Sequence, residues 1–414
     1  MDEHDVPGGA GLASPLPAAL PGTGKRARWR GAGVWIARIL LFLCLLAGAF
    51  CSLWPSGRTA VRALTILPGI LSASQPVWQK PVAEPVVHTL RTLSTASGLV
   101  YLDVYAPSAG APPVPGSREG MLMITGVGDN RQEPQVVNFA QTLARAGMVV
   151  MGVTTPALMD DRVDAGDREA VVEAFQILQH WPTVGAARVG MFGISAGSAL
   201  ICLAAADARI RAQVAFISLL GAYFDTTTLL ETLGRRAQVI DGKTQPWSPV
   251  AVPLQALAST IAPALPEGDG AVLLQAFANY PAGALSSQQL AQLAPQSAAL
   301  YHLLAGDQPR SVMANLAALT PDLRALLVQL SPSSVVSQLH APVYLLHDRT
   351  DQFVPVSESQ AFAAALARLH HTYDFAEFGI FQHADVRAGT GLPQLLGDGQ
   401  RLFRLLSKVA QVGS

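Results

Sequence analysis

A serine flanked by glycines is the feature of this sequence that most directly suggests chemistry. Ser195 is the centre of a Gly-Ile-Ser-Ala-Gly segment, Gly193 to Gly197, within the stretch Ala187 to Ala206. A serine hydroxyl is a weak nucleophile, so it must face a base that takes its proton and N–H groups that stabilise an oxyanion. A sharp strand-to-helix turn presents a serine in this way, and it needs neighbours without bulk two positions away. The pattern therefore predicts a catalytic nucleophile at Ser195.

The residues around this turn support the same interpretation. Val189 to Phe192 has the pattern of a buried strand, and Ala199 to Ala204 that of an apolar helix covered on most sides. A helix that begins at Ala196 would add its dipole and its unpaired N–H groups to the site. The alternative is a purely structural glycine turn, because glycine and serine are common residues.

Two later segments carry an acid and a base in the order that such a nucleophile needs. Leu345 to Pro355 contains Asp348 and Asp351, and Phe381 to Val386 contains His383. In a catalytic triad the histidine takes the serine proton and returns it to the leaving group, while the carboxylate fixes the imidazole tautomer and stabilises its charged form. The chain order is thus nucleophile, acid, base.

These segments resemble the α/β-hydrolase superfamily over roughly residues 86 to 411. The acid segment resembles an apolar strand followed by H-G-x-x-D and V-P, with Asp348 standing where glycine is usual. The resemblance implies that Asp351 is the acid, that His383 is the base in the loop after the last strand, and that His347 is structural. Asp348 remains an alternative acid, although its place nearer the strand better suits stabilisation of a turn.

A second glycine-rich turn, Thr125 to Gly128, resembles the oxyanion loop of the same superfamily. The usual motif is H-G-x-G, and Thr125 stands in place of the histidine. The resemblance implies an oxyanion hole formed by the N–H groups of Val127 and Ala196, each worth about 3 kcal/mol in the transition state. The segment also reads as an ordinary glycine turn after a strand, and both interpretations can hold together.

Alternating strands and one-sided helices must position these residues. The expected strands are Thr89–Leu93 and Leu99–Tyr105 as a hairpin, then Met121–Thr125, Met148–Val153, Arg188–Phe192, Ala212–Leu219, Ala341–Leu346 and Thr372–Phe378. Helices are expected around Val136–Ala144, from Asp167, after Ser195, over Ser357–Leu369 with a capping box at Ser357-x-x-Gln360, and near Gln400 to Val409. This order predicts an α/β protein with the α/β-hydrolase fold, a mostly parallel central sheet flanked by helices.

Residues 222–340 contain Leu-rich pieces separated by prolines and no convincing strand pattern. They are too long for a structureless loop in a compact domain. We predict a helical cap inserted between the first part of the hydrolase core, 86–221, and the second, 341–411. The cap can offer an apolar lining to a pocket beneath it. Its apolar surface can equally be buried within the cap, on a membrane or on another subunit.

The N-terminal region carries a candidate membrane anchor. Residues 1–30 are rich in Gly, Pro and Ala and predict a disordered cytoplasmic tail, whereas Gly31 to Trp54 is mostly apolar over 24 residues. About 20 residues suffice to cross a bilayer. Four positive charges just before this segment favour a single-pass signal anchor with the catalytic domain on the extracytoplasmic side. Cleavage after Ala47-Gly48-Ala49, giving a secreted protein, is the alternative, and residues 55–85 read as a proline-containing linker.

Composition argues against several other kinds of site. The net charge of −1 gives no reason to expect nucleic acid as a partner. The three cysteines are Cys44, Cys51 and Cys202, and only Cys202 lies in the body of the chain, so a disulfide inside the folded domain is not possible. The sequence has no C-x-x-C or H-E-x-x-H motif, and we expect neither a metal nor another cofactor.

The leading hypothesis is a membrane-anchored serine hydrolase that cleaves a small-molecule carboxylic ester through an acyl-enzyme. Its triad would be Ser195, Asp351 and His383. An acyltransferase or a serine peptidase remains open, because a triad defines neither the acceptor nor the leaving group. A catalytically silent fold used as a binding module is the alternative from another class. The presence of all three triad residues in order argues against it.

Overall fold

The computed structural model describes residues 85–108, 118–379, 381–382, 385–386, 397–398 and 400–401 of the chain. The chain divides into two compact units, Met1–Arg58 and Thr59–Ser414, and every described residue lies in the second. The predicted tail, the apolar segment Gly31 to Trp54 and nearly all of the linker lie outside the described residues, as does most of the predicted last helix. Among the helices that are described, none is long and apolar enough to cross a bilayer.

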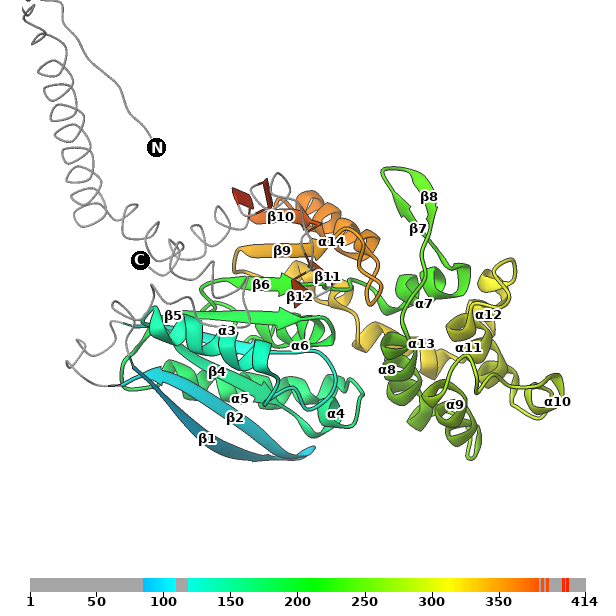
Figure 1. Ribbon diagram of the computed structural model, residues 1–414, viewed down its shortest axis with the longest axis horizontal. Coiled ribbons are helices and arrows are strands. Elements are labelled where there is room, and N and C mark those ends of the chain that lie inside the picture. The colour runs from blue at the N-terminus through cyan, green and yellow to red at the C-terminus, as the bar shows by residue number, and fades with distance from the viewer. Residues whose placement is uncertain are drawn as a thin grey trace, which may run out of the picture. The chain divides into compact units, whose positions relative to one another are not determined.

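An eight-stranded sheet forms the centre of the core, in the order β1-β2-β4-β3-β5-β6-β9-β10 (Figure 1). Its strands are β1 (Val86–Thr95), β2 (Gly98–Pro107), β3 (Arg118–Ile124), β4 (Val149–Thr154), β5 (Val184–Ile194), β6 (Ile217–Leu220), β9 (Val343–Asp348) and β10 (Tyr373–Phe378). β2 is antiparallel to both of its neighbours, and all other neighbouring strands are parallel. A separate pair, β11 (Phe381–Gln382) and β12 (Asp385–Val386), follows β10. The predicted fold class is confirmed.

Helices cover both faces of this sheet, which a mostly parallel sheet requires because its strands are apolar on both sides. The core helices are α3 (Pro134–Arg145), α4 (Pro156–Met159), α5 (Arg168–Gln179), α6 (Ala196–Ala205) and α14 (Val356–Arg368), with a short 3-10 helix, η2, at Ala165–Asp167. Every residue of β9 is buried, and its successive side chains enter two different apolar clusters. One cluster includes side chains of α5, α6 and α14, and the other includes side chains of α3.

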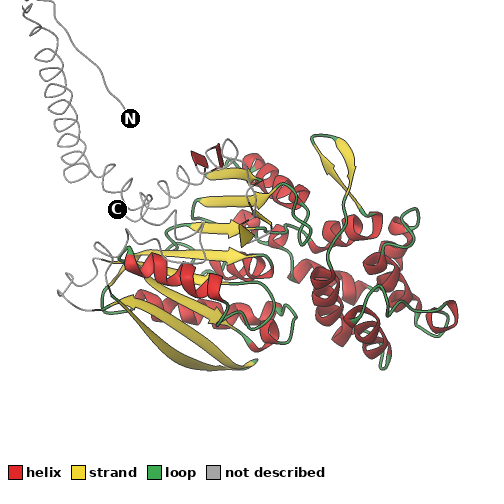
Figure 2. Cartoon of the chain, in the orientation of Figure 1, coloured by secondary structure: helices red, strands yellow, loops and turns green. Residues whose placement is uncertain are grey.

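The cap, residues 222–340, lies between β6 and β9 and is mainly helical (Figure 2). Its helices are α7 (Thr226–Arg235), α8 (Ala251–Ile261), α9 (Asp269–Ala278), α10 (Ser287–Leu290), α11 (Pro295–Ala305), α12 (Val312–Ala318) and α13 (Pro321–Gln329), with 3-10 helices η3 (Ala262–Ala264), η4 (Pro332–Ser334) and η5 (Val336–Gln338). Cap side chains form most of one apolar cluster, in which Leu233, Phe277 and Leu303 are fully buried, and Ala199 of α6 and Val354 join it from the core. Much of the apolar surface of the cap is therefore buried by packing within the cap.

The cap also contains a hairpin, so the prediction that it has no strand was wrong. β7 (Ala237–Ile240) and β8 (Lys243–Pro246) pair antiparallel. Each strand has four residues, too few for alternation to stand out in the sequence. They are joined by Asp241-Gly242, both at positive φ (51° and 73°), and Asp-Gly is the dipeptide that two-residue hairpin turns favour. The Asp241-Gly242 dipeptide was thus the one feature of the sequence near these strands that indicated the hairpin.

The predicted capping box at the start of α14 was also wrong. The N-cap of α14 is Pro355, which has no side-chain hydrogen bond to offer. The side chain of Gln360 instead donates a hydrogen bond to Glu377 on β10 at 2.8 Å. Gln360, which the capping box required at the start of α14, therefore makes a tertiary contact with β10 instead.

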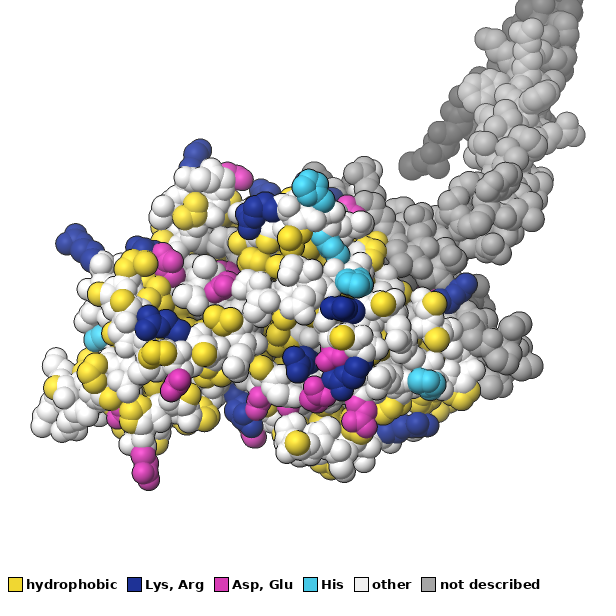
Figure 3. Space-filling view, turned by 180° about the vertical axis from the view of Figure 1, so that it is seen from behind, with side chains coloured by type: hydrophobic (Ala, Val, Ile, Leu, Met, Phe, Trp, Pro, Cys, Tyr) yellow, Lys and Arg dark blue, Asp and Glu magenta, His cyan; other side chains and the backbone are white. Residues whose placement is uncertain are grey.

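The surface carries charges of both signs rather than a broad patch of one sign on the face seen in Figure 3. Some charges are paired, as where Arg209 contacts Asp207 and Glu169, each at 2.8 Å. Exposed pairs of this kind contribute about 0–1 kcal/mol. The apolar clusters therefore supply most of the stability of the core and the cap.

Cys202 lies on α6, seven residues after Ser195, and its side chain is completely buried. Burial raises the pKa of this thiol, because a thiolate would lose its hydration. Cys202 is thus a packing residue of the helix that follows the turn at Ser195.

A buried carboxyl group holds the entry of the cap against the core. Glu358, on α14, is 3% exposed. Its Oε2 accepts hydrogen bonds from the backbone N–H groups of Phe224 (2.9 Å) and Asp225 (3.0 Å). Its Oε1 accepts one from the hydroxyl of Thr228 (2.6 Å). The exit of the cap joins the same cluster, because the Ser333 hydroxyl donates to Asp225 at 2.7 Å.

This carboxyl group makes the stability of the cap junction depend on pH. Burial raises the pKa of Glu358 above its ordinary value of 4.5, against the opposing effect of its three donors. The folded state therefore binds this proton more tightly than the unfolded state, so stability decreases as pH rises above about 4.5. Glu358→Gln cannot ionise, and its amide can donate to the Thr228 oxygen. We expect the free energy of unfolding of the variant to rise relative to wild type as pH increases above about 4.5.

Urea unfolding at several pH values tests this expectation. Glu231→Gln is the control, because Glu231 lies on α7 in a partly exposed pair with Arg235. A difference between Glu358→Gln and wild type that stays constant across the pH range would contradict the raised pKa.

Candidate active site

Ser195 occupies the turn between β5 and α6 in a backbone conformation that residues other than glycine rarely adopt. Its φ is 53° and its ψ is −123°. Positive φ at a residue with a side chain costs about 1–3 kcal/mol and persists only where the surroundings enforce it. The Ser195 N–H donates to the Leu220 carbonyl at 2.8 Å, and its own carbonyl accepts from Ser198 N–H at 2.9 Å. The neighbouring strand and the helix thus fix the turn from both sides.

The two flanking glycines are required by close contacts with the backbone. A Cβ on Gly193 would lie 2.6 Å from Ser198 Cα, and a Cβ on Gly197 would lie 2.3 Å from the Thr125 carbonyl oxygen. Real Cβ atoms do not approach so closely, and a backbone atom cannot rotate away as a side chain can. Gly197 therefore lets the first turn of α6 rest directly on the end of β3.

Gly197→Ala is expected to displace the Thr125 carbonyl and, with it, the turn that carries Val127. We expect kcat to fall by about 10²-fold, because a shift of about 1 Å in a catalytic group has an effect of that size. Gly152→Ala on β4 is the control, since its Cβ would meet other atoms only at 3.7 Å or more. Steady-state kinetics on both variants makes the comparison. Equal kcat values for the two would contradict the proposed contact.

Both backbone groups predicted for the oxyanion hole lie at Ser195. Val127 and Ala196 line one cavity together with Ser195. A Cβ on Gly126 would lie 3.4 Å from Ser195 Cβ, so the turn before Val127 touches the serine. No described residue accepts a hydrogen bond from the N–H of Val127 or of Ala196. Both donors are thus placed to bind an oxygen of a substrate.

Asn130 holds the Val127 turn, a role that the sequence analysis missed. Its side-chain amide donates to the carbonyls of Val127 (2.9 Å), Gly126 (3.1 Å) and Gly128 (3.3 Å). With its carbonyls turned toward Asn130, the turn leaves the Val127 N–H unpaired among the described residues. Asparagine often bonds to nearby backbone in turns, and its position two residues after Gly128 was the available signal.

The cavity beside Ser195 lies between the core and the cap and measures about 60 Å³. Its described lining comes from the Val127 turn, the serine turn, the cap entry, α8 and the acid segment: Val127, Val163, Ser195, Ala196, Tyr223, Thr226, Leu229, Val252, Pro253, Ala256, Leu257, Thr260, Leu330, Phe353 and Val354. None of these residues is charged. Thr260 also ties α8 to the core, because its hydroxyl accepts a hydrogen bond from Val163 N–H at 2.9 Å.

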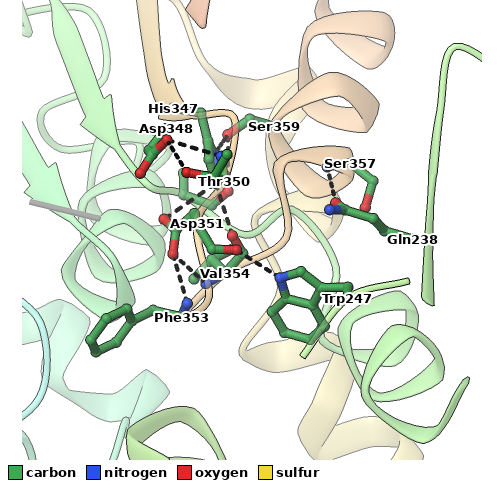
Figure 4. A network of polar contacts seen from close by, with 11 residues as sticks. Gln238, Trp247, His347, Asp348, Thr350, Asp351, Phe353, Val354, Ser357 and Ser359 are labelled. Atoms are coloured by element: carbon green, nitrogen blue, oxygen red, sulfur yellow. Dashed lines mark hydrogen bonds and ion pairs between the residues drawn. The ribbon is translucent and has the colours of Figure 1, made fainter. Parts of the chain in front are cut away.

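The predicted acid, Asp351, is 1% exposed and begins a tight turn after β9 (Figure 4). Its Oδ1 accepts hydrogen bonds from the N–H groups of Phe353 (2.7 Å) and Val354 (3.1 Å). Hydrogen bonds to the ionised form stabilise a carboxylate. We call residues 348–354 the acid turn, and its last two residues line the cavity beside Ser195.

The neighbouring residues of the acid turn have structural contacts. Asp348 Oδ1 accepts hydrogen bonds from the N–H (2.9 Å) and the hydroxyl (3.1 Å) of Thr350, as a turn-stabilising residue does. His347 is fully buried. Its Nε2 lies 3.0 Å from the Val354 carbonyl oxygen and 3.5 Å from Asp351 Oδ2, so this nitrogen must carry a proton. His347 thus faces Asp351 from within the core.

The predicted base, His383, lies outside the described residues. The structure therefore brings Ser195, Val127 and Ala196 together, places the acid turn against the same cavity, and leaves the position of the base as a prediction. Among the described residues no group of three or more His, Cys, Asp or Glu side chains could hold a metal ion.

Comparison with known proteins finds similar structures but no similar sequence. No protein-family model matches the chain, and no curated protein matches it. Porphyromonas gingivalis dipeptidyl peptidase 4 is 15% identical with a TM-score of 0.44, over 78% of this chain and 36% of that chain. A Mycobacterium tuberculosis puromycin-hydrolyzing peptidase is 16% identical with a TM-score of 0.47, over 79% and 40%. The esterase rPPE, as a variant, is 13% identical with a TM-score of 0.46, over 81% and 87%. The chain spans about two fifths of the length of the two peptidases.

The fold is assigned from the chain's own topology. β2 is antiparallel to both β1 and β4 in an otherwise parallel sheet, the turn that carries Ser195 joins β5 to α6, and the acid turn follows β9. A helical cap enters after β6, between the segments that carry Ser195 and Asp351. These features, in this order, give the chain the α/β-hydrolase fold that its motifs predicted.

Proposed function

We propose that this protein is a serine hydrolase that cleaves carboxylic esters of apolar, uncharged acyl groups. The observation that carries the proposal is the cavity beside Ser195, whose described lining is apolar apart from a few hydroxyl groups. An apolar pocket favours an apolar group, since each methylene that leaves water contributes about 0.8 kcal/mol. Burial of a charged group there would require an opposite charge, and no described lining residue offers one.

We infer the reaction from Ser195, the two N–H groups beside it and the predicted base. The Ser195 oxygen attacks the ester carbonyl carbon while its proton passes to His383, and the carbonyl oxygen becomes an oxyanion held by the N–H groups of Val127 and Ala196. The C–O bond to the alcohol then breaks, and His383 gives its proton to the departing oxygen. Water repeats the sequence on the acyl-enzyme, which releases the acid and restores the serine. Asp351 keeps the imidazole in the tautomer that can accept the proton.

The same triad would serve a peptidase or an acyltransferase, so the acyl cavity is what favours an esterase. A peptidase that removes residues from a free terminus must bind an ammonium or a carboxylate group, and ionised groups are buried only with partners. The described lining provides no charged partner for such a terminus. An acyltransferase would need a second acceptor to outcompete water.

A panel of substrates that share acyl groups tests the proposal. The panel contains p-nitrophenyl esters from acetyl to decanoyl, the matching anilides, and dipeptidyl anilides with a free amine. We expect kcat/KM for the esters to rise about fourfold per methylene until the cavity is full and then to fall. Preferred cleavage of the free-amine dipeptides would make the protein a peptidase. A flat profile, or activity confined to acetyl groups, would mean that the cap closes the site without lining it.

A change in the cavity wall tests the same point from the protein's side. Leu257→Trp, on α8, should shift the best acyl group to a shorter one, because the larger ring occupies space that the acyl chain would fill. Val328→Trp is the control, since Val328 is 53% exposed on α13 and does not line the cavity. Equal chain-length profiles for the two variants would remove α8 from the acyl site.

The segment Gly31 to Trp54 is proposed as a single-pass anchor that holds the catalytic domain on the extracytoplasmic side. The full chain is expected to remain with membranes after carbonate extraction, whereas a variant that lacks residues 1–54 is expected to be released. Protease added on the cytoplasmic side should leave residues after Trp54 intact. A soluble species that begins at Phe50 would instead demonstrate cleavage of a signal peptide.

A further inference from the structure

A residue of the cap binds directly to the backbone of the predicted catalytic acid. Trp247 follows the hairpin strand β8 and is 4% exposed. Its indole Nε1 donates a hydrogen bond to the carbonyl oxygen of Asp351 at 2.7 Å, and both groups are buried (Figure 4). A buried carbonyl that loses such a donor is left without a partner, which is unfavourable, so the contact constrains where Asp351 lies.

Trp247 is itself fixed within the cap. Its backbone N–H donates to the carbonyl of Arg236, the C-cap residue of α7, at 2.9 Å. The guanidinium group of Arg236 in turn donates to the carbonyls of Leu304 (2.8 Å) and Ala305, at the end of α11. The ring of Trp247 packs in the apolar cluster of the cap. The indole N–H is therefore presented by a rigid part of the cap rather than by a free loop.

A second hydrogen bond joins the same two segments. Val250 N–H donates to the carbonyl of Gln352 at 3.0 Å. Val250 is the N-cap residue of α8, whose Val252, Pro253, Ala256 and Leu257 line the cavity beside Ser195. Phe353 of the acid turn lines the same cavity. A group in the cavity thus touches both α8 and the acid turn, and residues 247–250 connect the two.

We propose that Trp247 is a positioning residue, through which the cap holds Asp351 in its working position. The proposal rests on the proposed ester hydrolysis at Ser195. Trp247 touches no reacting atom; it acts through the backbone of Asp351, which in turn orients the base. A cap that is seated on the core supplies this bond, and a cap displaced from the core removes it. Occupancy of the acyl cavity and alignment of the triad are therefore coupled through residues 247–250.

The coupling has a kinetic signature. An acyl group that fills the cavity packs against α8 and so favours the seated cap. Longer acyl groups should then raise kcat as well as lower KM, whereas a cavity that only binds would change KM alone.

Removal of the indole N–H tests the proposal. Trp247→Phe removes the donor together with part of the ring, and replacement of Trp247 by benzothienylalanine exchanges only the N–H for sulfur. In both we expect kcat to fall by about 10-fold to 100-fold with KM nearly unchanged, since the loss is one of alignment. We also expect the acid limb of the kcat/KM profile to move to lower pH, because a displaced Asp351 stabilises the protonated base less. The dependence of kcat on acyl length should disappear.

Tyr301→Phe provides the matched control. It removes a hydrogen bond between an aromatic side chain of the cap and the backbone, which the Tyr301 hydroxyl accepts from Leu285 N–H at 3.0 Å, away from Arg236 and the acid turn. A kcat and pH profile in the benzothienylalanine protein equal to those of wild type would overturn the proposal. So would a loss shared equally by Tyr301→Phe, or a raised KM with an unmoved pH profile, since these indicate only a loosened cap. Absence of ester hydrolysis in the wild-type enzyme would instead refute the proposed function.

Discussion

Ser195→Ala is expected to lower ester hydrolysis by about 10⁶-fold and to abolish labelling by a fluorophosphonate, because loss of the nucleophile removes the acyl-enzyme route. What remains should be a rate about 10³- to 10⁴-fold above the uncatalysed reaction, due to the N–H groups of Val127 and Ala196 and to substrate binding. The fold should persist, since alanine also removes the need to accommodate a hydroxyl in the turn. Mass-spectrometric detection of the phosphonylated peptide measures the outcome.

Ser198→Ala is the matched control for this variant. Ser198 lies in the first turn of the same helix, is completely buried, and its hydroxyl has no hydrogen-bond partner among the described residues. Labelling and activity should therefore be retained in Ser198→Ala. Labelling retained in Ser195→Ala as well would remove Ser195 as the nucleophile.

Asp351→Asn is expected to lower kcat by about 10⁴-fold. Its amide oxygen can still accept the two N–H bonds from Phe353 and Val354, so the acid turn should keep its shape. What is lost is the negative charge that stabilises the protonated base and fixes its tautomer. Steady-state kinetics, with circular dichroism to verify folding, gives the measurement.

Asp348→Asn separates the two candidate acids. Asparagine at this position can still accept from Thr350, so we expect both stability and kcat to change little. A large loss of kcat in Asp348→Asn with a small one in Asp351→Asn would move the acid to Asp348. Comparable losses in both would mean that the acid turn acts as a unit.

The features that local sequence determines were the ones that could be predicted. The spacing of Gly193, Ser195 and Gly197 is set by contacts within one turn, and the structure places these three residues at the end of β5 as expected. Most strands of the core were predictable because both faces of the sheet are covered, which makes strands such as β9 continuous apolar runs. The strand predicted over Ala212–Leu219 was placed too early, because residues 212–216 form a turn and irregular backbone and β6 begins only at Ile217. The antiparallel pairing of β2 with β1 and β4 could not be predicted in this way, because it depends on the order of the strands in the assembled sheet.

Features that depend on contacts between distant segments could not be predicted in the same way. Nothing in the sequence near Trp247 indicates that its indole binds a carbonyl 104 residues later. Gln360 likewise matches a capping box locally but bonds to Glu377 in the fold. Asn130 and the Asp241-Gly242 turn lie between these two groups. Both residue types are typical of turns, but the structural role of each depends on the segments around it.

The burial of Cys202 makes the helix behind the nucleophile open to measurement by thiol chemistry. The side chain is fully covered and its pKa is raised, so the folded state should resist alkylation. Reaction then requires α6 to separate from the sheet, and under conditions of rapid reclosure the modification rate reports the free energy of that opening. In a chain with Cys44 and Cys51 replaced, alkylation of Cys202 with and without a bound phosphonate would reveal how far covalent modification of Ser195 stabilises α6 on the sheet.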